Sequence, residues 1–123
     1  MTLLSQQEIE EYNEMIPMVG LDQRRKIRTL LERDSAERCR ESFIFFVSQM
    51  WPPFISGKHH QIMADAFERV ARGELKRLII NMPPRHTKSE FASYLLPAWF
   101  LGMYPEKKII QTAHTAELAV GFG

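Results

Sequence analysis

Residues 77–90 read Arg-Leu-Ile-Ile-Asn-Met-Pro-Pro-Arg-His-Thr-Lys-Ser-Glu. The branched apolar residues at the start of this stretch favour a strand that is buried on both faces. A loop without glycine follows, and helical spacing resumes at Lys88. A second apolar run, Lys108 to Thr112, comes after that helix. This order predicts the beginning of a doubly wound α/β domain, in which 77–81 and 108–112 are neighbouring parallel strands.

The residues before this stretch predict a helical segment. The expected helices are Ser5 to Met15, Asp22 to Glu32, Ala36 to Met50 and His60 to Arg72. Asp34 or Ser35 is expected to cap the third helix. We therefore divide the chain into a helical N-terminal segment, 1–57, and an α/β part, 58–123.

Three further positions predict local features of the helices. Ser5 and Glu8 have the spacing of a capping box at the first helix. Pro97 lies inside the helix that follows the loop and is expected to kink or shorten it. Thr115 is expected to cap a final helix.

The composition excludes several classes of protein. The chain has 123 residues, of which 45% are hydrophobic and 25% are charged, with a net charge of +1, as in an ordinary globular protein. Its longest apolar run, Phe43 to Val47, is far shorter than the roughly 20 residues of a membrane helix. The single cysteine, Cys39, provides neither an internal disulfide nor a cysteine-rich metal site. We expect a cytoplasmic protein without membrane contact.

The loop ends in Lys88 and Ser89 at the start of a predicted helix. A phosphate bound there would meet unpaired backbone N–H groups and the positive end of the helix dipole. A lysine can reach terminal phosphates, and a serine hydroxyl can ligate Mg²⁺. In the phosphate-loop pattern G-x-x-x-x-G-K-[ST], however, Met82 and Thr87 occupy both glycine positions. The residues alone therefore also fit an ordinary helix start with a solvated lysine.

The stretch from about His60 to Gly123 closely resembles the ATPase domain of the tailed-phage terminase large subunit. In that family the loop reads Pro-Pro-Arg-His, then Gly or Thr, then Lys-Ser, as residues 83–89 do here. The resemblance implies a P-loop NTPase fold with ATP and Mg²⁺ as cofactors. It also implies an N-terminal fragment of an ATP-driven DNA-packaging motor, truncated before the acidic Walker B strand and lacking the nuclease domain.

The resemblance also implies partners and a location. They are double-stranded DNA, the small terminase subunit and the portal protein, in the cytoplasm of the infected host cell. Oligomers are expected only of the full-length protein.

The resemblance assigns roles in the loop. Lys88 would contact the β and γ phosphates, and Ser89 would ligate Mg²⁺. Arg85 would be catalytic, because a guanidinium there can stabilise charge that develops on the γ-phosphate. The residues expected to bind the nucleotide are Pro84, Arg85, His86, Thr87, Lys88, Ser89, Gln61 and His60.

Gln61 and His60 open the helix before the loop, where related ATPases place residues that read adenine. The Gln61 amide can pair with the adenine edge, and Trp51 or Phe54 can lie against its face. A helix-capping role for His60 and a core position for Trp51 remain the alternatives.

Two other functions stay open on the sequence. One is a non-enzymatic helical interaction module with a vestigial phosphate loop. The other is a helicase-like DNA-dependent ATPase. Because no Walker B carboxylate is recognisable, we do not expect rapid ATP turnover from this chain.

Overall fold

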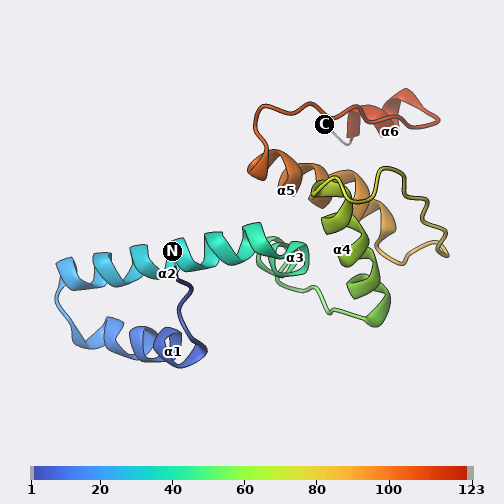
Figure 1. Cartoon of the computed structure of the whole chain (residues 1–123). Helices are drawn as coiled ribbons and strands as arrows, with labels where there is room; N and C mark the ends of the chain where they lie inside the picture. Colours follow the sequence, from blue (N-terminus) through green and yellow to red (C-terminus); the bar gives the residue numbers. More distant parts are fainter. Residues whose placement is uncertain (1, 122–123) are drawn as a thin grey trace. The chain divides into compact units, whose positions relative to one another are not determined.

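The computed structural model describes residues 2–121, and every regular element among them is helical (Figure 1). The chain divides into two compact units, of which unit 1 ends at Glu41 and unit 2 begins at Ser42. Unit 1 contains α1 (Gln6–Met15), the 3₁₀ turn η1 (Ile16–Met18) and α2 (Leu21–Glu41). Unit 2 contains α3 (Phe43–Met50), α4 (Lys58–Ala71), the π-helical segment η2 (Glu90–Leu95), α5 (Leu96–Met103) and α6 (Ala116–Gly121).

Unit 1 opens with the predicted capping box, which the structure confirms. The Ser5 hydroxyl accepts a hydrogen bond from the Glu8 backbone N–H at 3.2 Å. In return, the Glu8 carboxylate accepts from the Ser5 N–H at 2.7 Å. These hydrogen bonds lower the pKa of the Glu8 carboxyl.

Asp34 does not restart a helix as expected, because α2 runs through it without interruption. Its carboxylate instead accepts from the Leu4 N–H at 2.7 Å and from Arg38 Nε at 2.6 Å. The Arg38 guanidinium also donates to the Leu4 carbonyl. Both oxygens of the buried Asp34 carboxylate thus accept hydrogen bonds, and these bonds join the segment before α1 to α2.

The helical break falls at Ser42, so the single helix expected over 36–50 is wrong. Ser42 has extended backbone angles, and its hydroxyl accepts from the Phe45 N–H at 3.3 Å. The Glu68 carboxylate of α4 accepts from the Phe43 N–H at 2.9 Å. A side chain from another helix therefore satisfies one of the free N–H groups with which α3 begins.

An aromatic core holds unit 2 together. Its buried members come from four helical elements and are Phe43, Val47, Met63, Ala64, Phe67, Phe91 and Trp99. Phe43 is fully buried and lies edge-on to the rings of Phe67, Phe91 and Trp99, with centroids 5.4–5.6 Å apart. Edge-to-face contacts of this kind stabilise a core beyond the burial of area alone.

The predicted α/β fold is contradicted by the structure. No strand forms among residues 2–121, and 77–81 and 108–112 are extended segments outside any sheet. Ile79 is 86% exposed and Ile110 is 90% exposed, whereas central strands would bury both. The helices bury their apolar faces around Phe43 instead, and two short extended segments alone do not make a stable sheet.

The helical stretch after the loop changes type before Pro97. Residues 90–95 form the π-helical η2, and α5 follows with Pro97 in its first turn. In an α-helix the Ser93 carbonyl would accept from residue 97, but proline has no N–H. The Gln111 side-chain amide donates to that carbonyl at 2.7 Å. The extended segment around Gln111 is thereby attached to the helix at a carbonyl whose α-helical donor position is a proline.

Candidate phosphate-binding loop

The loop between the extended segment 77–81 and η2 has two residues in the left-handed backbone region. Arg85 has φ 65° and Thr87 has φ 59°, and neither is a glycine. Such a conformation costs a non-glycine residue about 1–3 kcal/mol, and a β-branched residue resists it most. Thr87 occupies the position of the second glycine in the phosphate-loop pattern, directly before Lys88. The backbone here thus has the conformation that glycine normally supplies.

The Thr87 hydroxyl links the loop to α4. It lies 2.7 Å from Nε2 of His60 and donates to the His86 carbonyl at 2.6 Å. On its other side, His60 Nδ1 accepts from the Gly57 N–H at 2.8 Å. Because Nδ1 is the acceptor, the proton of the neutral ring is on Nε2, which therefore donates to Thr87.

His60 is enclosed, with only 6% of its surface exposed. Its ring centroid lies 4.8 Å from that of Phe54, 5.1 Å from Phe91 and 3.8 Å from His59. Burial lowers the pKa of the His60 imidazole below its ordinary value, and the nearby His59 and His86 rings lower it further. The ring is therefore neutral near pH 7, as its hydrogen bonds require.

The loop passes directly into the helix. The Thr87 carbonyl accepts from the Phe91 N–H at 3.0 Å, which is the first helical hydrogen bond. The N–H groups of Lys88, Ser89 and Glu90 precede this bond and have no carbonyl of the helix to pair with. N–H groups in this situation are those that bind phosphate oxygens in other proteins.

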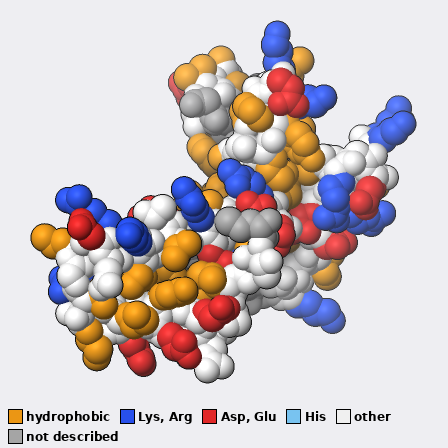
Figure 2. Space-filling view, turned by 60° about the vertical axis from the view of Figure 1, so that its left-hand side comes forward, with side chains coloured by type: hydrophobic (Ala, Val, Ile, Leu, Met, Phe, Trp, Pro, Cys, Tyr) orange, Lys and Arg blue, Asp and Glu red, His pale blue; other side chains and the backbone are white. Residues whose placement is uncertain are grey.

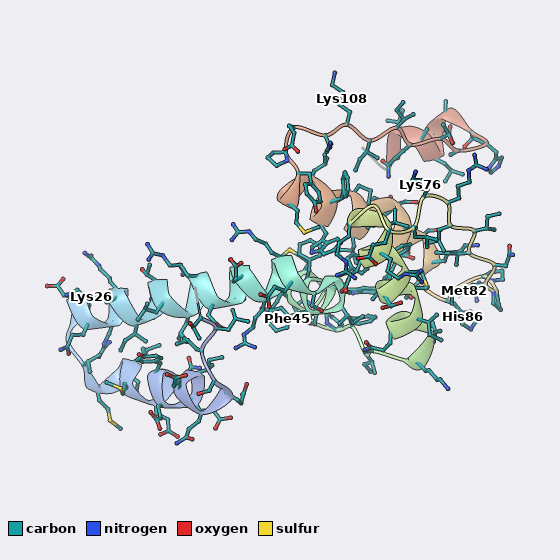
Figure 3. All side chains as sticks on the ribbon, viewed as in Figure 1. Lys26, Phe45, Lys76, Met82, His86 and Lys108 are labelled. Carbon is teal, nitrogen blue, oxygen red and sulfur yellow. The ribbon has the colours of Figure 1, made fainter. Side chains whose placement is uncertain are left out.

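Lys88 and Ser89 line a cavity of about 440 Å³. The remaining lining residues, from α4, the segment 76–80 and the helix after the loop, are Phe67, Val70, Lys76, Leu78, Ile80, Ala92, Ser93 and Leu96. Lys76, labelled in Figure 3, thus joins Lys88 as a second cationic residue of the cavity. The sequence pattern did not predict Lys76 as part of the site, because only the tertiary structure brings it to the cavity beside Lys88. No carboxylate is among the lining residues given for this cavity.

Three predicted loop residues lie at the exposed turn. Pro84, Arg85 and His86 are all exposed, and the His86 ring donates from Nδ1 to the Pro84 carbonyl at 2.9 Å (Figure 3). The proline carbonyl and the histidine ring thus stabilise the turn itself. Within residues 2–121, Arg85 has no hydrogen bond or ion pair, and its catalytic role stays a prediction.

The residues expected to read adenine are not gathered into one site. The Gln61 amide donates to the Ser56 hydroxyl at 2.6 Å, within the segment that leads into α4. Phe54 packs against His60 and Phe91, and Trp51 packs against Phe54 at 5.8 Å. These contacts give His60 and Phe54 positions in the packing beneath the loop, and the adenine contacts stay a prediction.

A magnesium ion at the loop would depend on Ser89 and on the nucleotide. Among residues 2–121, no three His, Cys, Asp or Glu side chains are grouped so that they could hold a metal ion. Ser89 is exposed at the cavity next to Lys88, which fits an ion held by one hydroxyl, phosphate oxygens and water. The donor set thus fits Mg²⁺ that arrives with a polyphosphate.

Comparisons with family models, with curated proteins and with solved structures find no match to this chain. Within the described part of the chain, no helix has the length and apolar composition needed to cross a bilayer.

Proposed function

We propose that this chain binds Mg·ATP through residues 84–89 and forms the nucleotide-binding portion of a DNA-packaging motor of the terminase large-subunit type. Under this proposal its partners are double-stranded DNA, the small terminase subunit and the portal protein. The motif Pro-Pro-Arg-His-Thr-Lys-Ser supports the family, and the geometry of the loop supports the ligand.

The observation that carries the proposal is the left-handed backbone of Thr87 directly before Lys88. The phosphate-loop pattern has a glycine at this position because the backbone must turn there to present its N–H groups to the phosphates. The main objection to the motif is that a threonine replaces this glycine, and the positive φ of Thr87 answers it. Strained residues of this kind cluster at functional sites, which supports a ligand at this helix start.

The cavity beside the loop agrees with a polyphosphate ligand. Lys88 and Lys76 bring two positive charges to it, and Ser89 brings a hydroxyl. We assign Lys88 to the terminal phosphates, Ser89 to Mg²⁺ and Arg85 to the charge that develops on the γ-phosphate. The described lining of this cavity contains no carboxylate that could orient an attacking water, so we assign no water-activating residue and propose binding rather than rapid hydrolysis.

Binding by this loop does not require a sheet. In the all-helical unit, the hydrogen bond from His60 holds Thr87, and the buried Phe91 anchors the helix that follows. The N–H groups of residues 88–90 thus lie between two residues that are attached to the packed part of unit 2.

The test is titration of a fluorescent ATP analogue with Mg²⁺ against wild type, Lys88→Ala, Arg85→Ala and Lys108→Ala. Lys88→Ala should weaken binding about ten- to a hundredfold, since it removes a charge-assisted contact of roughly 1.5–3 kcal/mol. Arg85→Ala should weaken it less, because its proposed partner charge develops only in the transition state. Lys108→Ala removes an exposed lysine that is not among the cavity residues and is the matched control. Equal binding by wild type and Lys88→Ala would contradict the proposal.

A helical interaction module is the second candidate, and exposed apolar residues in unit 1 favour it. Met18 is 83% exposed and Leu21 is 74% exposed, and the two residues lie on either side of the turn between η1 and α2. Figure 2 shows hydrophobic side chains at the surface among charged ones. If wild type does not bind the nucleotide analogue, this reading becomes the better one.

A further inference from the structure

We propose that His60 is a positioning residue for the phosphate loop, because its ring bridges the Gly57 N–H and the Thr87 hydroxyl and so holds Thr87 in the left-handed conformation. This inference rests on the proposed function, since it names what sets the loop's affinity for phosphate. Under this inference, His60 maintains the backbone conformation of the loop and does not contact adenine.

The direction of each hydrogen bond in this bridge is determined. The Gly57 N–H can only donate, so His60 Nδ1 accepts and His60 Nε2 carries the proton. Nε2 then donates to Thr87 Oγ1, and the Thr87 hydroxyl in turn donates to the His86 carbonyl. One tautomer of His60 therefore pairs with both the Gly57 N–H and the Thr87 hydroxyl, and replacing the ring removes both of these hydrogen bonds.

Neighbouring rings enclose the His60 ring, which is only 6% exposed. Phe54 and Phe91 pack against it, and Phe91 is completely buried. At Gly57, a Cβ would lie 3.0 Å from Cε1 of His59 and 3.4 Å from Nδ1 of His60, so the backbone passes close to both histidine rings. The backbone at the start of α4 thus lies directly against the His60 ring, which contacts the loop.

The strain at Thr87 explains why such a bridge is needed. A threonine with φ 59° returns readily to the extended region unless another group holds it. His60 is 27 residues away along the chain, and among the described residues it is the hydrogen-bond partner of the Thr87 side chain from outside the loop. Glycine at position 87 would need no such support.

This dependence defines a double-mutant cycle. His60→Phe keeps an aromatic ring in the pocket but removes both hydrogen bonds. Affinity for the fluorescent ATP analogue with Mg²⁺ is measured for wild type, His60→Phe, Thr87→Gly and the double variant. We expect His60→Phe to weaken binding about tenfold when residue 87 is threonine and by less than twofold when it is glycine. The same loss in both backgrounds would show that His60 merely fills space, and would overturn the inference.

A matched control and a measurement without ligand complete the test. His59→Phe replaces the neighbouring exposed histidine, whose ring lies 6.0 Å from that of His86 but which has no hydrogen bond to the loop among the described residues, and should change affinity by less than twofold. In ¹⁵N spectra of the wild-type histidine rings, His60 should be neutral with its proton on Nε2 at pH 7.5. A proton on Nδ1 would overturn the inference even if His60→Phe fails to fold.

The two proposals fail in different ways. If wild type and Lys88→Ala bind the analogue equally, the nucleotide function fails. The role of His60 is then still tested by the tautomer of its ring and by the rate at which trypsin cleaves the loop after Arg85. Faster cleavage in His60→Phe than in His59→Phe is expected, and equal cleavage contradicts the bridge. If Lys88→Ala weakens binding but the cycle shows no coupling, the nucleotide function stands and the positioning role falls.

Discussion

A threonine with a positive φ stands directly before the lysine of the loop, and it can do so because a histidine from α4 holds its hydroxyl. The sequence showed Thr87 as a departure from the glycine pattern. It could not show how the departure is compensated, because the compensating group lies far away in the chain. A short-range pattern describes residues three or four positions apart, whereas the conformation of Thr87 depends on a contact across 27 positions.

The same histidine predicts how the stability of unit 2 depends on pH. The ordinary pKa of histidine is 6.5, and burial lowers the pKa of His60, with His59 and His86 adding repulsion. Its other ring neighbours, Phe54 and Phe91, carry no charge. A group whose pKa is lowered by folding contributes its full stability above about pH 6.5, and this contribution is lost as the pH falls through the folded value.

The expected outcome is a midpoint of chemical denaturation, followed by tryptophan fluorescence, that falls between pH 7.5 and pH 5. In His60→Phe the fall should be smaller, since the group that titrates is gone. An identical slope in wild type and variant would show that His60 does not set the pH dependence.

Among the helical elements, breaks occur where side chains satisfy or remove backbone hydrogen bonds. Ser42 ends the long helical stretch because its hydroxyl and Glu68 both accept from N–H groups of α3. The Thr115 hydroxyl accepts from the Leu118 N–H at 3.3 Å and caps α6, which confirms the expected cap. Pro97 leaves the Ser93 carbonyl without its α-helical donor, and Gln111 provides one.

Gln111→Leu tests this last arrangement. The variant keeps the size of the side chain but leaves the Ser93 carbonyl without the amide, and should lower the free energy of unfolding by about 1 kcal/mol. Thr112→Val, at the exposed neighbouring position, should change it by less than about 0.5 kcal/mol. The measurement is urea denaturation followed by tryptophan fluorescence, and equal effects of the two variants would show that the contact contributes nothing.

At the scale of the whole chain, the two units are stabilised by different means. Unit 2 has a cluster of buried aromatic and aliphatic side chains, centred on Phe43. In unit 1, within the described residues, only Ile27 and Asp34 are buried. A buried carboxylate with two donors therefore has an unusually large part in holding unit 1 together.

Asp34→Asn should destabilise unit 1 by about 1–3 kcal/mol, because the charge that binds Arg38 and the Leu4 N–H is lost. Burial raises the pKa of Asp34, but the hydrogen bonds and charge of these partners lower it more, so its net pKa lies below the ordinary 3.8. The stability that it contributes is thus complete above about pH 4 and is lost as the pH falls through the folded value.

Amide hydrogen exchange of residues 5–41 measures this effect. Glu37→Gln is the matched control, since it removes a more exposed carboxylate, paired with Arg40, from the same helix. Exchange in Asp34→Asn should be faster than in the control, and equal rates would contradict a role for Asp34 in stability.

Features whose partners are close in sequence could be predicted from the amino-acid sequence. The capping box at Ser5 and the cap at Thr115 each depend on a residue three positions away, so their spacing alone was sufficient. The Lys-Ser pair at a helix start was predicted for the same reason, since the helical period begins there.

Features that depend on distant partners were decided by tertiary structure. The apolar composition of 77–81 and 108–112 predicted strands, but a strand exists only where a neighbour pairs with its backbone, and in residues 2–121 none does. The helices had Phe43 to pack against and formed an aromatic core without a sheet. Likewise, only the packed molecule brings His60 to Thr87 and Lys76 to Lys88, because these contacts require α4 and the extended segment to lie beside the loop.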